Sequence, residues 1–331
     1  MFFCCFYQNV YHHNQNNHSH TMRKVIGIGE TVLDIIFRND EPIGAVPGGS
    51  VFNGIISLGR AGVPTTFISS TGSDRVGQRI IRFLQENGVD HSQINVYPGS
   101  KSPISLAFLN EDNDADYVFY KDHPHDQLDF SYPDVQPDDV VMFGSFYAVN
   151  PVIRPQVQGF LEYARNKGAI LYYDVNFRAS HQQEVIKITP YLLENLELAH
   201  VVRGSVDDFE VLFKKKDADA IYRSDVAFYS KKFICTHGAQ PVQLRAENAL
   251  RKEYPVIKTS TVSTIGAGDN FNAGFVYGLI KSKVSREMME QALPETLWDQ
   301  LIAHAQQFSA NCCQSIDNSI DKAFGLKLQQ Q

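Results

Sequence analysis

The residues best suited to chemistry lie in the stretch 261–281, TVSTIGAGDNFNAGFVYGLIK. Gly266 and Gly268 allow the backbone to approach a ligand closely, and the free amide groups of the helix predicted to follow them would face an anion. Asp269 lies in the first turn of that helix, where the helix dipole favours an ionised carboxylate. An amide cradle beside a fixed carboxylate suits phosphoryl transfer to a hydroxyl, because the amides stabilise the phosphoryl oxygens and the carboxylate accepts the proton. The alternative is that Asp269 only caps a helix.

Three glycine-containing motifs together resemble a known enzyme family. Residues 266–275, GAGDNFNAGF, resemble the C-terminal signature of the ribokinase-like (pfkB-type) carbohydrate kinases. Residues 48–62, GGSVFN through LGRAG, resemble the N-terminal signature of that family, and residues 72–77 resemble its G-x-D-x-x-G continuation. The resemblance spans residues 25–313 and implies ATP-dependent phosphorylation of a sugar hydroxyl.

The resemblance assigns the sugar and the reaction to specific residues. Asp269 is the implied general base, and the implied anion hole consists of Gly266, Ala267 and Gly268. The implied sugar-binding residues are Asp34, Gly48, Gly49, Asn53 and Arg178. A carboxylate at position 34 can accept two hydroxyl hydrogens. The guanidinium of Arg178 can bind phosphate bidentately, although a structural ion pair with Asp174 is an equal alternative.

The resemblance also implies ATP and Mg²⁺ as cofactors. The implied nucleotide-binding residues are Thr236, Gly238 and Asn311. Ser205 and Asp208 replace the N-x-x-E pair that helps to hold Mg²⁺ in relatives, so we expect Asp208 to reach the metal through water. Ser263 replaces an aspartate that helps to bind a monovalent cation in relatives, which leaves the need for such a cation open.

The sequence resembles fructokinase-type members most, and we therefore expect fructose to be converted to fructose 6-phosphate. A kinase for 2-keto-3-deoxygluconate, ribose or a nucleoside remains an alternative, as does a sugar-sensing relative without turnover. The absence of a Walker A motif excludes an ordinary P-loop enzyme.

Composition excludes several other classes of protein. The net charge of −7 argues against a nucleic-acid partner, and no apolar run approaches the ~20 residues of a membrane span. Five cysteines without a metal-binding spacing suggest reduced thiols in a cytoplasmic protein. Residues 1–21 are rich in Asn, Gln and His, and we expect them to be a disordered or spurious extension.

The remaining pattern, over residues 22–331, predicts one α/β domain with the functional residues at strand ends. We expect a three-layer α/β/α sandwich with a mostly parallel sheet, because short apolar runs alternate with amphipathic stretches. The expected strands lie at residues 25–29, 65–69, 140–143, 169–173, 199–202 and 233–236. The expected helices lie at residues 52–60, 76–87, 154–167, 184–196, 206–213 and 297–313.

Two segments predict a small β-sheet lid over the sugar site. Residues 104–109 and 117–121 alternate between apolar and polar types around a polar turn, which indicates a hairpin. Together with residues 35–46, they resemble the lid of these kinases, which we place at about 35–46 and 100–122. Such lids often pair between subunits in relatives, so we expect a homodimer.

Overall fold

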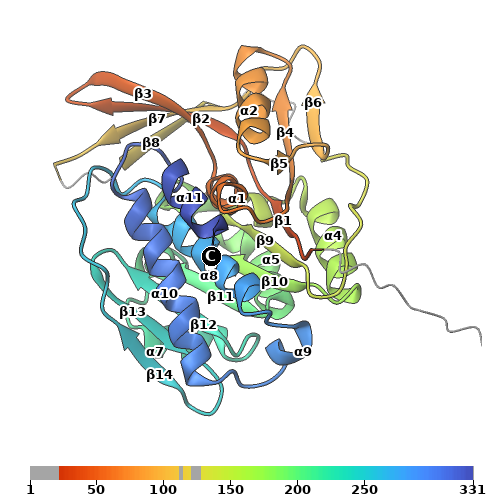
Figure 1. The fold of residues 1–331 in the computed structure, drawn as a ribbon, viewed down its shortest axis with the longest axis vertical. Coiled ribbons are helices and arrows are strands. Elements are labelled where there is room, and N and C mark those ends of the chain that lie inside the picture. Colours follow the sequence, from red (N-terminus) through yellow and green to blue (C-terminus); the bar gives the residue numbers. More distant parts are fainter. Residues whose placement is uncertain (1–21, 112–114, 121–127, 331) are drawn as a thin grey trace, which may run out of the picture.

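The computed structural model describes residues 22–111, 115–120 and 128–330. Its body is a ten-stranded sheet between two layers of helices, and a separate four-stranded sheet projects from one end (Figure 1). The α/β/α sandwich with a small second sheet confirms the predicted fold class. The extension predicted at residues 1–21 lies outside the described residues.

The main sheet is parallel from β12 to β5 and antiparallel only at the β13 and β14 edge. Its central strands are buried on both faces, as parallel strands covered by helices must be. In spatial order the strands are β14 (Arg251–Tyr254), β13 (Gln240–Arg245), β12 (Phe233–His237), β11 (Val201–Ser205), β10 (Ile170–Asp174), β9 (Val140–Gly144), β1 (Val25–Ile28), β4 (Thr65–Gly72) and β5 (Val89–Asp90), with β6 (Ile94–Tyr97) also paired to β4.

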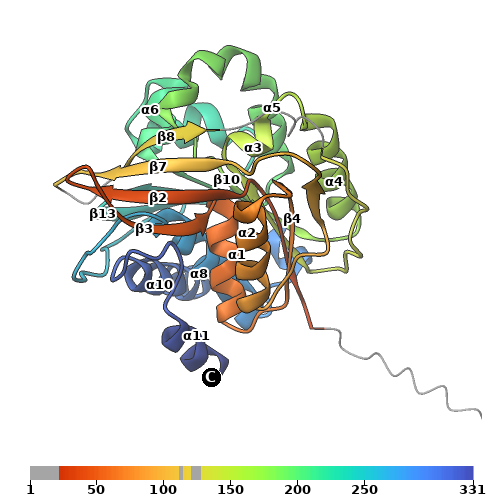
Figure 2. The same cartoon turned by 90° about the horizontal axis from the view of Figure 1, so that it is seen from above.

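Two apolar cores hold the helices against opposite faces of this sheet. Figure 2 shows the two layers on either side of the strands. One layer contains α1 (Ser50–Arg60), α2 (Arg75–Glu86), α8 (Ala267–Lys281), α9 (Arg286–Met289), α10 (Glu295–Cys312) and α11 (Lys322–Gln329). The other contains α3 (Ser145–Val149), α4 (Arg154–Asn166), α5 (Val185–Leu198), α6 (Val206–Phe213) and α7 (Ala218–Ile221).

The second sheet, which we call the lid sheet, has the strand order β3-β2-β7-β8. It consists of β2 (Val32–Arg38), β3 (Glu41–Gly48), β7 (Ile104–Leu109) and β8 (Ala115–Tyr120). The predicted hairpin is present as the antiparallel pair β7 and β8, although β8 begins two residues before the predicted strand. Because β2 follows β1 directly, the lid sheet begins at the carboxyl end of a central strand.

Most differences from the predicted elements are shifts at their ends. Strand β11 begins at Val201 rather than at residue 199, because α5 continues to Leu198. Helix α11 was not predicted; it begins after Asp321, whose carboxylate accepts hydrogen bonds from the Ala323 and Phe324 amides. No helix in the described part of the chain is both long and apolar enough to cross a membrane.

Candidate active site

The glycine-rich loop ahead of α8 has close contacts on both sides. Gly266 precedes the helix with φ of 76°, and a Cβ on it would lie 2.7 Å from the carbonyl oxygen of Asn318. A Cβ on Gly268 would lie 3.0 Å from a guanidinium nitrogen of Arg203. Glycine is therefore required at Gly266, and a side chain at position 268 would press on Arg203, so the loop keeps its backbone open to a cavity at the start of α8.

Asp269 lies in the first turn of α8 and faces this cavity. Its Oδ2 accepts a 2.8 Å hydrogen bond from Nδ2 of Asn53 in α1. Burial raises the pKa of the Asp269 carboxyl to about 6, although Asn53 and Arg178 stabilise the ionised form. At neutral pH the carboxylate is therefore ionised and still basic enough to accept a proton from a hydroxyl.

A cavity of about 700 Å³ lies between the lid sheet, the start of α1 and the loop after β10. Its volume is in the range of small-molecule sites. Six of the residues predicted from the sequence line it: Asp34, Gly49, Asn53, Arg178, Gly266 and Asp269. Gly48 lies behind Asp34, since a Cβ on Gly48 would be 2.3 Å from the Asp34 Oδ2 atom.

Gly49, between β3 and α1, and Asp34, in β2, both line the edge of this cavity. Gly49 has φ of 130°, and a Cβ on it would lie 2.2 Å from the carbonyl oxygen of Glu30. Asp34 is 4% exposed. Its Oδ1 accepts a hydrogen bond from Ser105 Oγ in β7, and its Oδ2 accepts one from Asn318 Nδ2. Burial raises the pKa of Asp34 to about 6, and one lone pair on each oxygen remains for a ligand hydroxyl.

Arg178 reaches the cavity beneath a tyrosine of the lid sheet. Its Cζ lies 4.5 Å from the centre of the Tyr117 ring, which is a cation–π distance. Within the described residues Arg178 forms no ion pair, whereas the alternative partner Asp174 pairs with Arg203. The structural ion pair considered for Arg178 is thus made by another arginine.

A second cavity of about 240 Å³ adjoins the first and shares Asp269 with it. Its lining residues are Tyr117, Asn176, Arg178, Arg203, Ser205 and the loop residues 264–269. Arg203 is held by Asp174 Oδ1 at 2.9 Å and by the hydroxyl of Thr236. Asp269 therefore stands between a cavity with hydroxyl-binding groups and one with backbone amides and two guanidinium groups.

This arrangement agrees with comparisons to known proteins. The model of the pfkB family of carbohydrate kinases matches residues 22–293. The chain belongs to this family.

Individual relatives are more distant. The kinase is 27% identical over 255 residues to a 5-dehydro-2-deoxygluconokinase of Geobacillus kaustophilus (strain HTA426), covering 73% of this chain and 75% of the relative. The fold is shared with fructokinase from Vibrio cholerae O395 in its fructose, ADP and calcium ion bound form (TM-score 0.79, 18% identity, 93% and 99% of the chains covered). It is also shared with aminoimidazole riboside kinase from Salmonella enterica, complexed with aminoimidazole riboside and an ATP analog (TM-score 0.77, 20% identity, 93% and 99% covered).

In this kinase the predicted metal-binding residue, Asp208, lines neither cavity, although its partner Ser205 lines the smaller one. Its Oδ1 accepts a hydrogen bond from the Phe177 amide and its Oδ2 one from the Ser205 amide. Ser205 accepts a hydrogen bond from the Asp208 amide in return, so the two residues form a capping box at the start of α6. The shorter Ser and Asp side chains thus shape the helix start, and each Asp208 oxygen accepts one backbone amide.

None of the predicted nucleotide residues lines either cavity. Thr236 is the second-last residue of β12 and is bonded to Arg203, which lines the smaller cavity. Gly238 follows with φ of 49°, and nothing would lie within 4 Å of a Cβ there. Asn311, near the end of α10, accepts a hydrogen bond from the Asp321 amide. Its carbonyl group is therefore engaged with the start of α11.

Sequence reasoning missed three residues of the site. Tyr117 had only the alternation of a lid strand, and Arg203 lay directly after the strand expected at residues 199–202, without a motif. Asn318 belonged to a tail with no assigned role. The structure extends β11 to Ser205, and a longer predicted strand would have indicated Arg203, because an arginine within a buried parallel strand needs a buried carboxylate partner.

Proposed function

We propose that this kinase transfers the γ-phosphoryl group of ATP to a hydroxyl of a keto sugar or keto-deoxy sugar acid, with Asp269 as general base. The observation that carries the proposal is the position of Asp269 at the junction of the two cavities. The larger cavity would hold the sugar and the smaller one the transferred phosphoryl group.

The chemistry follows from the groups on each side. Asp269 takes the proton of the sugar hydroxyl, whose oxygen attacks the γ-phosphorus, and the bond between that phosphorus and the β–γ bridging oxygen breaks to release ADP. The Gly266 and Gly268 amides and the guanidinium of Arg203 stabilise the charge on the phosphoryl oxygens. The Ala267 amide already donates to the Thr264 carbonyl oxygen at 3.1 Å. Asp34 and Asn53 orient the sugar through its other hydroxyls.

Magnesium fits this site as an ion carried by the nucleotide. Among the described residues, no group of three His, Cys, Asp or Glu side chains could hold a metal ion, and Mg²⁺ is commonly bound by one or two carboxylates plus substrate phosphates. When bound, the ion would neutralise charge on the β- and γ-phosphates. Asp208 accepts one backbone amide at each of its oxygens, and we expect any contribution from it to be made through water.

Arg178 favours a sugar acid as the substrate. Its guanidinium lines the sugar-sized cavity and, within the described residues, has no carboxylate partner, so a substrate carboxylate could pair with it bidentately. The name of the Geobacillus relative, a 5-dehydro-2-deoxygluconokinase, agrees with such a substrate. Fructose is the second candidate, because Asp34 and Asn53 bind hydroxyls irrespective of a carboxylate.

A coupled ADP-release assay against 5-dehydro-2-deoxygluconate, 2-keto-3-deoxygluconate, fructose, ribose and nucleosides tests the proposal. We expect kcat/KM to be highest for a keto-deoxy acid. For that substrate, Arg178→Gln should raise the sugar KM by about tenfold or more, as expected when an ion-paired carboxylate loses its partner. Preference for fructose, with little effect of Arg178→Gln on its KM, would favour the second candidate. ADP release with none of the sugars would support a sugar-sensing protein.

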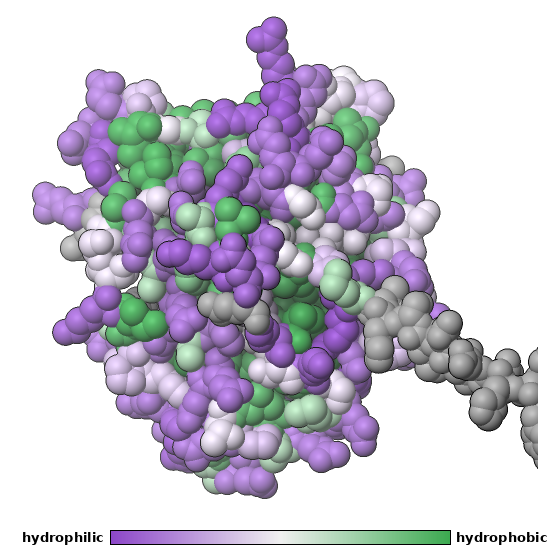
Figure 3. Space-filling view, in the orientation of Figure 1, coloured by the Kyte–Doolittle hydropathy of each residue, from purple (hydrophilic) through white to green (hydrophobic). Residues whose placement is uncertain are grey.

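We also propose a homodimer formed through the lid sheet and a cytoplasmic location. Apolar side chains gather over the lid strands in Figure 3, and Ile43, Val118 and Tyr120 are exposed there. Cys235, Cys312 and Cys313 are free thiols, as expected in a reducing compartment. Light scattering should give a dimer mass, and Ile43→Asp should lower it to that of a monomer.

A further inference from the structure

The chain segment between α10 and α11 returns to the sugar cavity. Its residue Asn318 has no solvent-exposed surface. The match to the family model ends at residue 293, so this segment lies beyond the part of the chain that defines the family. Its contacts are therefore features of this chain to be explained individually.

The side chain of Asn318 is bonded to the carboxylate that faces the sugar. Its Nδ2 donates a 2.8 Å hydrogen bond to Oδ2 of Asp34, whose other oxygen accepts from Ser105. A carboxylate only accepts, so the amide must present its NH₂ group here. The Asp34 carboxylate is thus held from both sides, which fixes its plane relative to the cavity.

The backbone of Asn318 contacts the anion loop. Its carbonyl oxygen accepts a 2.9 Å hydrogen bond from Asn270 Nδ2 in α8. The same oxygen would lie 2.7 Å from a Cβ on Gly266. The same Asn270 amide group also donates to the Gly266 carbonyl oxygen at 2.8 Å. One residue therefore touches both the sugar-side carboxylate and the loop proposed to bind phosphate.

Further hydrogen bonds fix the segment in place. The Ile320 amide donates to Ser57 Oγ at 3.1 Å, and Ser57 Oγ donates to Asn270 Oδ1. Arg60 Nη1 donates to the Ile320 carbonyl oxygen at 2.6 Å. Because Ser57 and Arg60 belong to α1, the segment is clamped between α1 and α8, and Asn318 has little freedom to move.

We propose that Asn318 is a positioning residue for the sugar: it holds the Asp34 carboxylate ionised and correctly oriented, and it links this carboxylate to the anion loop. The inference rests on the proposed function, in which Asp34 accepts sugar hydroxyls. Since Asn318 does not line either cavity, it would act on the substrate only through Asp34.

The first test is Asn318→Ala, assayed with the sugar for which the wild type has the highest kcat/KM. We expect the sugar KM to rise about tenfold or more, as when a hydrogen bond to a charged group is lost. The ATP KM should change by less than about twofold, because ATP makes no contact that depends on Asp34.

Asn195→Ala is the matched control. Asn195 is also fully buried and accepts a 2.7 Å hydrogen bond from Arg154, but it lies in α5 on the other face of the sheet. It should lower the melting temperature and leave both KM values unchanged. If Asn318→Ala behaves in the same way, its role is only structural and the proposal is wrong.

The second test is the isosteric change Asn318→Asp, which places two carboxyl groups within hydrogen-bonding distance. Two such groups share one proton, and full ionisation makes them repel. We expect the sugar KM of this variant to increase as the pH rises, whereas in the wild type protonation of Asp34 weakens binding as the pH falls. The same pH dependence in both proteins would overturn the proposal.

A third measurement does not depend on catalysis. Titration of ¹³Cγ-labelled aspartate by NMR, with Asp34→Asn used for assignment, reports the ionisation of Asp34 directly. Burial already raises the pKa of Asp34, and Asn318 opposes this shift, so Asn318→Ala should raise this pKa further. An unchanged Asp34 titration would refute the inference, whereas a wild type that phosphorylates no sugar would refute the proposed function alone.

Discussion

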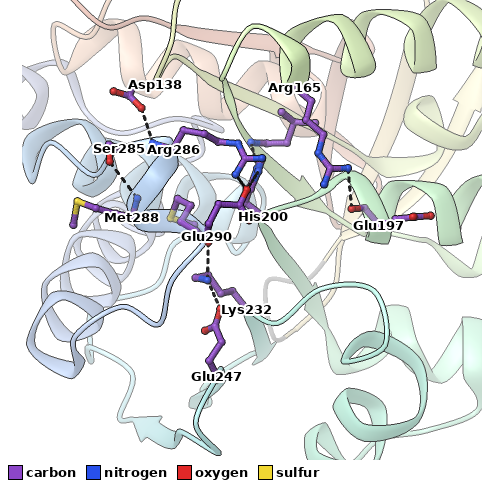
Figure 4. Close-up of polar contacts among 12 residues, drawn as sticks. Asp138, Arg165, Glu197, His200, Lys232, Glu247, Ser285, Arg286, Met288 and Glu290 are labelled. Carbon is purple, nitrogen blue, oxygen red and sulfur yellow. Dashed lines mark hydrogen bonds and ion pairs between the residues drawn. The ribbon is translucent and has the colours of Figure 1, made fainter.

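The two ends of the same parallel strands bury charged groups in opposite ways. Strand β11 begins after His200 and ends at Ser205, and β12 begins after Lys232 and ends near Thr236. The strand starts carry the ionic cluster drawn in Figure 4, and the strand ends carry the two cavities. The comparison shows which buried charges serve structure and which are available for chemistry.

At the strand starts, charged groups are matched by neighbours within the protein. Lys232 Nζ donates to Glu247 Oε1 and to the Met289 carbonyl oxygen. Arg286 pairs with Glu290, and the Arg286 amide donates to Asp138 (Figure 4). These ion pairs form within the protein, and the cluster residues line neither of the two cavities, so this cluster indicates stability rather than function.

At the strand ends, charged and polar groups converge on space that a ligand can fill. Asp34 and Asp269 keep lone pairs directed into the larger cavity, and Arg178 and Arg203 line the smaller one. A buried charge alone therefore does not mark an active site. The informative feature is a set of such groups whose remaining hydrogen-bonding capacity faces a common cavity.

The largest expected effect is at the strand ends. Asp269→Asn should lower kcat by about 10²–10⁴-fold, the usual contribution of a positioned general base. The melting temperature should change little, because the variant also removes a carboxylate that is costly to bury. Steady-state kinetics and thermal unfolding of the same preparation check both parts. Retention of more than about a tenth of the wild-type kcat would rule out base catalysis by Asp269.

The matching change at the strand starts should have the reverse effect. Lys232→Met leaves Glu247 without its partner and should lower the free energy of unfolding by about 2–4 kcal/mol. This loss lies at the lower end of the range for a broken buried ion pair, because Glu247 is 20% exposed. The kcat of the folded enzyme should stay close to that of the wild type. A large fall in kcat without a loss of stability would mean that the cluster contributes to catalysis.

Acid should act oppositely on the stability of the two ends. Burial, together with the nearby cations Arg286, Arg165 and Lys232, lowers the pKa of His200 from its usual 6.5 to about 3. Its neutral Nδ1 accepts a hydrogen bond from the Leu171 amide, and Glu290 lies 3.9 Å from its Nε2. The unfolded chain binds a proton that folded His200 does not, so its contribution to stability is lost as the pH falls from about 6.5 towards about 3.

Asp34, Asp208 and Asp269 change the stability with pH in the opposite direction, because burial raises the pKa of each from 3.8 to about 6. The folded protein binds protons at these carboxyl groups more tightly than the unfolded chain does. The contribution of the three groups to the stability therefore falls as the pH rises from about 4 to about 6.

Melting temperatures at about pH 5 and about pH 7.5 separate the two contributions. For each variant, the quantity to compare is its melting temperature minus that of the wild type at the same pH. For His200→Asn this difference should be more positive at the lower pH than at the higher. For Asp269→Asn it should be more negative at the lower pH. Wild-type kcat/KM should also decline below about pH 6, with a midpoint that belongs to Asp34 and Asp269 jointly. Shifts of the same sign in the two variants would contradict the assigned pKa directions.

The sequence predicted the fold and six of the residues that line the larger cavity, because both depend on local patterns. Apolar runs and glycine motifs identify strands and loops, and Asp34, Asn53 and Asp269 lie within or directly beside such patterns. Arg203 and Asn318 could not be predicted in this way. Their importance comes from partners far away in the sequence, Asp174 and Asp34, which only the folded chain brings into contact.

The same limit explains Asp208. Its place in the motif predicts a contact with Mg²⁺ through water, and its side chain also bonds to two backbone amides that the motif does not indicate. A motif gives the position of a residue in the chain, whereas the length of the side chain decides which partners it can reach.

The smallest expected effect concerns the monovalent cation, at the loop that precedes α8. Ser263 is buried, and its Oγ accepts a 3.1 Å hydrogen bond from the Ile265 amide. The Cys312 thiol lies 3.5 Å from the Ile265 carbonyl oxygen and 3.6 Å from that of Asp317. Protein donors thus occupy oxygens of this loop, and no carboxylate stands at position 263 to favour an ion.

We therefore expect replacement of potassium by sodium to change kcat by less than about twofold, since an ion without differential contacts shifts no equilibrium. Ser263→Asp is the complementary variant. A carboxylate buried at this position would be destabilising unless a cation pairs with it, so potassium should raise the melting temperature of this variant and leave the wild type unaffected. A strong potassium requirement in the wild type would show that backbone carbonyls alone build a cation site. The donors around Ser263 and Cys312 would then have to rearrange when the ion binds.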